Sequence, residues 1–175
     1  MTRLLSLAAG VQIDVAPADM VTVAHDAGWP AVGIWFDGKT WTDSTSREVR
    51  QRLDDTEVVA LDIEPIIPSE DGNDFAEQLI EAAAVIGARH ILFTSRLKDQ
   101  VRTTDRYQQV CEMARPHGIK VVCEFLPIFP LSTLSMAAEI VENSRATNGG
   151  VLIDNLHLSR SGSSIKELSG LPREL

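Results

Sequence analysis

Cysteine is scarce in this sequence: the chain has 175 residues and only two of them, Cys111 and Cys123. Two cysteines do not make the disulfide framework that stabilises small secreted domains, so we expect a reducing compartment, the cytoplasm. Neither cysteine lies in a motif typical of a nucleophilic thiol. A chain of this length is sufficient for a single domain, residues 1–175, with its own hydrophobic core.

Positive charge is also in short supply. Sixteen lysines and arginines stand against 25 aspartates and glutamates, which gives a formal net charge of −9. Nucleic acids and anionic membranes attract basic surfaces, so this balance argues against both as partners. A phosphorylated metabolite needs only one or two local donors and stays compatible with it. The sequence also lacks the roughly 18 continuous apolar residues of a membrane span.

Several motifs for phosphate binding and nucleophilic catalysis are missing. The sequence has no GxxxxGK loop, no GxGxxG after the first expected strand and no GxSxG elbow. These absences argue against the common nucleotide-binding loops and against a serine hydrolase. The segment SRSGSS, residues 159–164, offers hydroxyls, an arginine and backbone amides that could hold a phosphate or a sugar hydroxyl.

Short apolar runs, nearly continuous in hydrophobicity, recur along the chain instead. This is typical of parallel strands that are buried on both faces. The expected strands cover residues 4–10, 31–36, 57–64, 90–95, 119–125 and 150–155. Helical segments lie between them, at residues 17–28, 45–53, 74–88, 105–118 and 132–146, with a last short one from residue 164.

The helix starts carry capping signals. Thr45 with Glu48, and Ser164 with Glu167, have the spacing of a capping box. A strand and a helix thus alternate six times with a period of roughly 30 residues, which predicts an α/β fold with a parallel sheet. Two architectures stay open: an open doubly wound sheet, or a (β/α)8 TIM-type barrel without its last two units, since eight units need about 250 residues.

Acidic residues follow several of the expected strands, and ligands bind at the carboxyl ends of parallel strands in both architectures. The residues at these ends are Asp37, Asp62, Glu64, Thr94, Ser95, Arg96, Glu124, Asp154 and His157. Clustered carboxylates repel unless they share a cation or a proton. A divalent metal, Mn, Mg, Co or Zn, suits carboxylate and imidazole ligands, and Glu124 and Asp154 follow adjacent strands. For Asp37 and Asp62, a solvated loop position or a helix cap is the simpler interpretation.

Two segments resemble a known family. CEFLP, residues 123–127, followed by LIDNLHLSRSG, residues 152–162, resembles the xylose isomerase-like barrels, the sugar phosphate isomerase/epimerase superfamily. AHDAGWPAVGIWF, residues 24–36, and AAAVIGARHILF, residues 82–93, are similar to further segments of that family. The resemblance runs along essentially the whole chain in order.

The resemblance implies a (β/α)8 barrel with a divalent metal at the carboxyl ends of strands five to eight. Glu124 would be a metal ligand and a catalytic acid/base, and Asp154 a second ligand. His157 would bind a substrate oxygen; in an extended chain it would lie up to roughly 10 Å beyond Asp154. Arg160 would contact an anionic or hydroxylated end of the substrate, and Glu64 would line the pocket.

The implied activity is a sugar or sugar-phosphate isomerase or epimerase, in which metal-assisted proton transfer next to a carbonyl passes through an enediolate. The family's ligands on strands seven and eight have no counterpart within the 175 residues. The alternative is therefore a truncated, non-catalytic barrel that binds a small ligand or needs a partner chain. A homo-oligomer is one way to cover its open edges. A DNA-repair nuclease of the related endonuclease IV type is disfavoured by the charge and by only four histidines.

Overall fold

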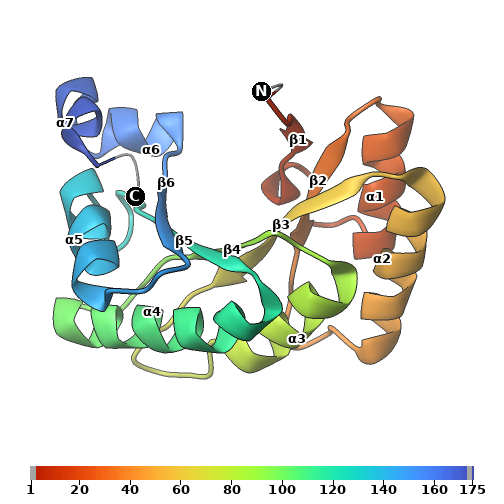
Figure 1. Cartoon of the computed structure of the whole chain (residues 1–175), viewed down its shortest axis with the longest axis horizontal. Helices are drawn as coiled ribbons and strands as arrows, with labels where there is room; N and C mark the ends of the chain where they lie inside the picture. Colours follow the sequence, from red (N-terminus) through yellow and green to blue (C-terminus); the bar gives the residue numbers. More distant parts are fainter. Residues whose placement is uncertain (1–2, 173–174) are drawn as a thin grey trace. The chain divides into compact units, whose positions relative to one another are not determined.

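Six strands, in the order in which they occur along the chain, make up one parallel sheet (Figure 1). The computed structural model describes residues 3–172 and 175. The strands are β1 (Ser6–Leu7), β2 (Ala31–Trp35), β3 (Val59–Ile66), β4 (His90–Phe93), β5 (Lys120–Glu124) and β6 (Gly149–Leu152). Sequential order confirms the barrel-type prediction, because a doubly wound sheet reverses its strand order at a switch point.

Helices follow the strands. They are α1 (Pro17–Asp26), α2 (Asp43–Thr56), α3 (Ala76–Ile86), α4 (Gln100–Ala114), α5 (Leu134–Ser144), α6 (Asn155–Arg160) and α7 (Ile165–Gly170), with 3-10 turns at Ala9–Val11 and Arg115–His117. Among the described residues, no helix has both the length and the apolar character that a bilayer crossing requires. The pattern of six βα units is confirmed, with an additional short helix, α6, that was not predicted.

The chain divides into two compact units. The first comprises Met1–Pro65 and Glu77–Ile91, and the second comprises Ile66–Ala76 and Leu92–Leu175. The single domain expected for residues 1–175 stays a prediction.

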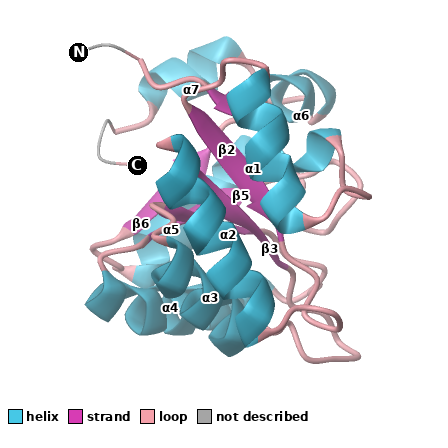
Figure 2. Ribbon diagram, turned by 90° about the vertical axis from the view of Figure 1, so that its right-hand side faces the viewer, coloured by secondary structure: helices cyan, strands magenta, loops and turns pink. Residues whose placement is uncertain are grey.

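In the first unit, α1 and α2 pack against each other, and α1 packs against β2 (Figure 2). Their apolar faces are fully buried, as Val21 on α1, Ile34 on β2 and Val49 on α2 show. Gly33 on β2 pairs with Asp62 on β3. A Cβ at Gly33 would lie 2.8 Å from the Asp62 carboxylate and 2.8 Å from a backbone nitrogen, so this position requires glycine.

In the second unit, Tyr107 of α4 ties the helix to two strands. Its side chain is fully buried, its hydroxyl donates to the Val121 carbonyl at 2.8 Å and accepts from the Gly150 amide at 3.0 Å. Both cysteines are buried and unpaired. Burial raises the pKa of the Cys111 thiol to about 12, which agrees with the expectation that neither thiol is a nucleophile.

Two helix starts test the capping signals. The box predicted at Ser164 and Glu167 is confirmed as the start of α7. The box predicted at Thr45 and Glu48 is wrong: α2 begins at Asp43, and Thr42 caps it by accepting from the Thr45 amide. Thr42 and Thr45 form the capping box instead, because the side chain of each accepts from the backbone amide of the other.

Candidate functional site

Glu124, at the end of β5, belongs to the second unit. Its neighbour Cys123 is fully buried and interacts with Cys111 of α4, so that side chain faces the helix. Because successive side chains alternate between the two faces of a strand, Glu124 projects from the opposite face. Burial, and to a smaller extent the nearby Asp154 carboxylate, raises the pKa of Glu124 to about 7. Glu124 receives no hydrogen bond from the described part of the chain, so its charge calls for a proton or a cation.

Asp154 lies two residues after the end of β6 and caps α6, the blue helix labelled in Figure 1. Its Oδ1 accepts hydrogen bonds from the amides of Leu156 at 2.7 Å and His157 at 2.9 Å. The expectation of an extended chain after Asp154 is therefore wrong. An aspartate is a strong helix cap, and residues 155–160 form a turn and a half of helix that brings His157 back towards Asp154.

Glu124, Asp154 and His157 come together. Each offers one ligand atom, and these atoms all lie within 4.8 Å of one another. Donors that share one ion lie up to two metal–ligand bonds apart, roughly 4 to 5 Å, so the spacing suits a single divalent cation. Two carboxylates and an imidazole are also a donor set that manganese, cobalt or zinc accepts. The residues therefore fit a metal.

The other predicted site residues lie outside this cluster of three. Arg160 is the exposed last residue of α6. Glu64 lies in β3 in the first unit, half-buried, and pairs in register with Trp35. Asp37 is exposed, and its carboxylate accepts from the Lys39 amide, which fits the simpler interpretation of a loop residue.

Asp62 is not the solvated loop residue or helix cap that the sequence suggested. It lies inside β3, where burial raises its pKa to about 6 while His90 lowers it. The sequence signal that could have indicated this burial is Gly33, which pairs with Asp62. A glycine in a buried strand often marks the close approach of another group.

The chain is similar in sequence to an isomerase and in structure to several solved proteins. The inosose isomerase of Bacillus subtilis (strain 168) is 26% identical over 100 residues, which is 51% of this chain and 36% of that protein. The structure of the IOLI protein with a binding zinc atom superposes with a TM-score of 0.84 at 16% identity, covering 98% of this chain and 70% of that one. D-psicose 3-epimerase in the presence of D-fructose superposes with a TM-score of 0.76 at 14% identity, covering 93% and 67%.

These solved structures share the fold, and the aligned stretch spans about a third of the curated relative. The sequence model of the xylose isomerase-like TIM barrel family matches residues 21–173. That range contains Glu124, Asp154 and His157 and the strands β2 to β6. The chain therefore belongs to the xylose isomerase-like TIM barrel family.

Proposed function

We propose that this chain is part of a divalent-metal-dependent isomerase or epimerase that acts on a sugar or sugar phosphate. The observation that carries the proposal is the cluster of Glu124, Asp154 and His157 at the carboxyl ends of β5 and β6. Its relatives support the reaction class, since one is an inosose isomerase and a structural neighbour is a sugar epimerase.

Glu124 has two proposed roles, and the other residues have one each. Glu124 and Asp154 hold the ion, which when bound would polarise a substrate carbonyl and favour loss of the neighbouring proton. Glu124 is also the acid/base group that exchanges that proton, since it projects from the strand end beside Asp154 and His157. His157 binds a substrate oxygen from beside the two carboxylates. Arg160 contacts the hydroxylated or anionic end of the substrate.

Completion of the site is part of the proposal. The remaining metal ligands and the second acid/base group come from further residues of a longer protein or from a partner chain, and a homo-oligomer is one such arrangement. If neither is supplied, the chain binds a small ligand without turnover, which is the second candidate function. Two buried, unpaired cysteines and the net charge of −9 support a reducing compartment such as the cytoplasm, and a small molecule rather than a nucleic acid as the ligand.

Calorimetric titration of Mn²⁺ tests the metal site. Asp154→Asn removes the charge and keeps the helix cap, since asparagine caps as well as aspartate. We expect it to weaken Mn²⁺ binding at least tenfold. Asp99→Asn is the matched control, because Asp99 caps α4 with its Oδ1 bonded to the Val101 and Arg102 amides in the same way. Equal affinity of wild type and Asp154→Asn would contradict the proposal.

His157→Asn separates the two roles open to the histidine. If His157 binds substrate, the variant keeps its Mn²⁺ affinity within about threefold, and turnover falls in the completed enzyme. Loss of Mn²⁺ binding in His157→Asn would instead make the histidine a metal ligand. Asp154→Asn and His157→Asn are compared at the same pH, because protons compete with metal for the carboxylates and the imidazole.

A further inference from the structure

Arg96, just after the end of β4, forms no ion pair with a carboxylate of the described residues. The guanidinium of Arg96 lies 4.8 Å above the centre of the Phe129 ring. Within residues 3–172 and 175, the guanidinium makes no hydrogen bond and no ion pair. Stacking of this kind uses the flat face of a guanidinium, so its N–H groups, which point outward in the plane, stay available.

Arg96 and Phe129 are both held in place by the backbone. The Arg96 amide donates to the Pro68 carbonyl at 2.9 Å. Phe129 lies in a tight turn after β5, where its amide donates to the Leu126 carbonyl at 2.9 Å, and the Leu126 amide donates to the Leu131 carbonyl at 2.9 Å. The main chain is fixed on both sides of the contact, and the Phe129 ring holds the guanidinium beside it, which reduces the entropy lost on binding.

Thr94 lies two residues earlier and has an unsatisfied hydroxyl. The residue is 2% exposed, and its Oγ1 has no hydrogen-bond partner in the described part of the chain. Buried hydroxyls are nearly always hydrogen-bonded, so an orphan needs an explanation. Stacking of Arg96 on Phe129 explains where the guanidinium lies. It does not explain why the Thr94 hydroxyl lacks a hydrogen-bond partner.

Thr94 and Arg96 project from the same face of the sheet. Their amides donate to the carbonyls of Ile66 and Pro68, the alternating pattern of a parallel ladder, so the chain stays extended past the end of β4. Ser95, between them, bonds to Thr103 of α4 at 3.1 Å and so faces the helix. Thr94 and Arg96 therefore face the opposite side, as Glu124 does on the neighbouring strand β5.

We propose that Thr94 and Arg96 form a subsite for an anionic group, a carboxylate or phosphate, on the ligand that the Glu124, Asp154 and His157 cluster binds. The inference rests on the proposed function and adds the class of ligand to it: an acidic or phosphorylated sugar rather than a neutral one. The guanidinium edge offers two parallel N–H donors to a planar or tetrahedral anion, and the Thr94 hydroxyl donates a further hydrogen bond.

Two matched pairs of ligands test the subsite by calorimetry on the full chain. The pairs are D-gluconate with D-glucitol, and D-fructose 6-phosphate with D-fructose. Each titration is run with EDTA and again with saturating Mn²⁺. We expect at least one anionic member to bind tenfold or more tightly than its neutral counterpart, in both conditions. The pair that shows the preference identifies whether a carboxylate or a phosphate is the anion.

The variants assign the preference to residues. Arg96→Gln should abolish it without changing the affinity for the neutral member, and Thr94→Val should reduce it roughly threefold to tenfold. Arg96→Lys keeps the charge without the two-pronged geometry, so we expect a partial loss. Lys98→Gln is the control, because it removes one exposed positive charge two residues away. Unchanged far-UV circular dichroism shows that each variant is folded.

Three outcomes would overturn the inference. The first is that neither anionic ligand binds more tightly than its neutral counterpart. The second is that Lys98→Gln lowers the preference for the anion as much as Arg96→Gln does, which would mean general electrostatic attraction. The third is that Arg160→Gln abolishes this preference while Arg96→Gln does not. The titrations in EDTA keep this test independent of the metal site. Loss of Mn²⁺ affinity in Asp154→Asn reports on the proposed function, whereas the anion preference in EDTA reports on Thr94 and Arg96.

Discussion

Asp62 is a carboxyl group inside a strand, and its burial makes the stability of the chain depend on pH. Its pKa is raised from 3.8 to about 6. A carboxyl whose pKa is higher in the folded than in the unfolded chain stabilises the fold most below the unfolded value. That contribution is lost as the pH rises through about 6. The shift corresponds to at most about 3 kcal/mol of the free energy of unfolding.

Asp62→Asn should remove this dependence, because an amide resembles the protonated acid and does not titrate. Relative to wild type, we expect the variant to gain about 1–3 kcal/mol in its free energy of unfolding as the pH rises from 4 to 7.5. Urea titrations across that range measure it. Asp55→Asn, at an exposed position on α2, is the control and should follow the wild-type profile. Parallel profiles for Asp62→Asn and wild type would show that the Asp62 carboxyl is not destabilised by burial.

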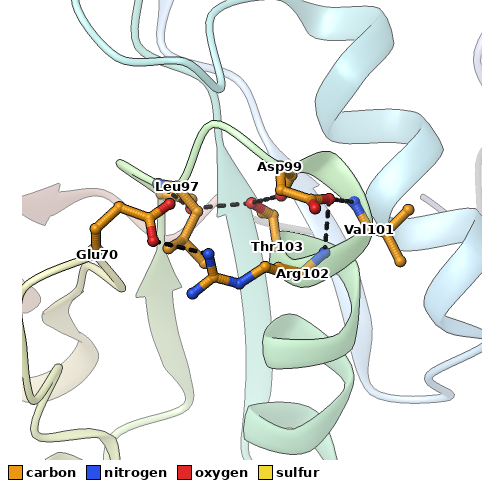
Figure 3. A network of polar contacts seen from close by, with 7 residues as sticks. Glu70, Leu97, Asp99, Val101, Arg102 and Thr103 are labelled. Atoms are coloured by element: carbon orange, nitrogen blue, oxygen red, sulfur yellow. Dashed lines mark hydrogen bonds and ion pairs between the residues drawn. The ribbon is translucent and has the colours of Figure 1, made fainter.

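At the scale of elements, the loop between β3 and α3 is held against α4 by two ion pairs of unequal kind. Arg102 donates to Glu70 at 2.7 Å, the contact drawn in Figure 3, and both side chains are about half exposed. Arg106 binds Asp74 through two hydrogen bonds, of 2.8 and 2.7 Å, and the Asp74 side chain is only 5% exposed. Asp74 also accepts from the Ala76 amide at the start of α3.

These pairs should differ in their contribution to stability. Asp74→Ala leaves Arg106 without its two-pronged partner and removes a bond to the helix start, so we expect it to cost about 1–3 kcal/mol. Glu70→Ala breaks a solvated pair and should cost less than about 0.5 kcal/mol. Guanidinium or urea unfolding of both variants gives the comparison. A larger loss of stability in Glu70→Ala than in Asp74→Ala would contradict the prediction that the Arg106–Asp74 pair contributes more.

The sequence predicts elements well where one periodic signal dominates. The strands β2 to β6 lie within three residues of their predicted bounds because each follows a nearly continuous apolar run. Helix α6 was missed because six residues are too few for a helical period. The start of α4 was placed five residues late, at residue 105, although Asp99 in fact caps a helix that begins at Gln100.

The candidate site was predicted only in part, because only some of its residues depend on the order of the strands alone. The strand ends place Glu124 and Asp154 at one edge of the sheet, and that requires only the order of the strands. The proximity of His157 depends on the helical turn after Asp154, which the sequence does not make evident. The stacking of Arg96 on Phe129 joins two loops that are 33 residues apart in sequence, and no local pattern encodes such a contact.

At the scale of the whole molecule, the three tryptophans offer a test of the single-domain prediction. Trp29, Trp35 and Trp41 all lie in the first unit, and the proposed metal site lies in the second. If residues 1–175 unfold as one domain, Mn²⁺ at about 100 times its dissociation constant stabilises the whole chain by about 2.7 kcal/mol. The thermal transition seen by tryptophan fluorescence should then rise by roughly 5–10 °C.

Circular dichroism serves as the second probe, since it follows helices in both units. Coincident shifts in the two signals would support one cooperative domain. A shift in circular dichroism without a shift in fluorescence would show that the units unfold independently. Glu124→Gln should abolish the Mn²⁺ effect in both signals, and Glu142→Gln, at an exposed position on α5, should keep it.

The cap that Asp154 places on α6 has a consequence for spectroscopy. Both capping bonds end on one carboxylate oxygen, Oδ1, and a cation on the same carboxylate would withdraw electron density from it. The amide protons of Leu156 and His157 would then become less deshielded, and their nuclear magnetic resonance signals would move upfield as the ion binds. The amides of Val101 and Arg102, which face the Asp99 cap, give the internal reference. The helix start thus works as a built-in indicator of metal occupancy that needs neither substrate nor turnover.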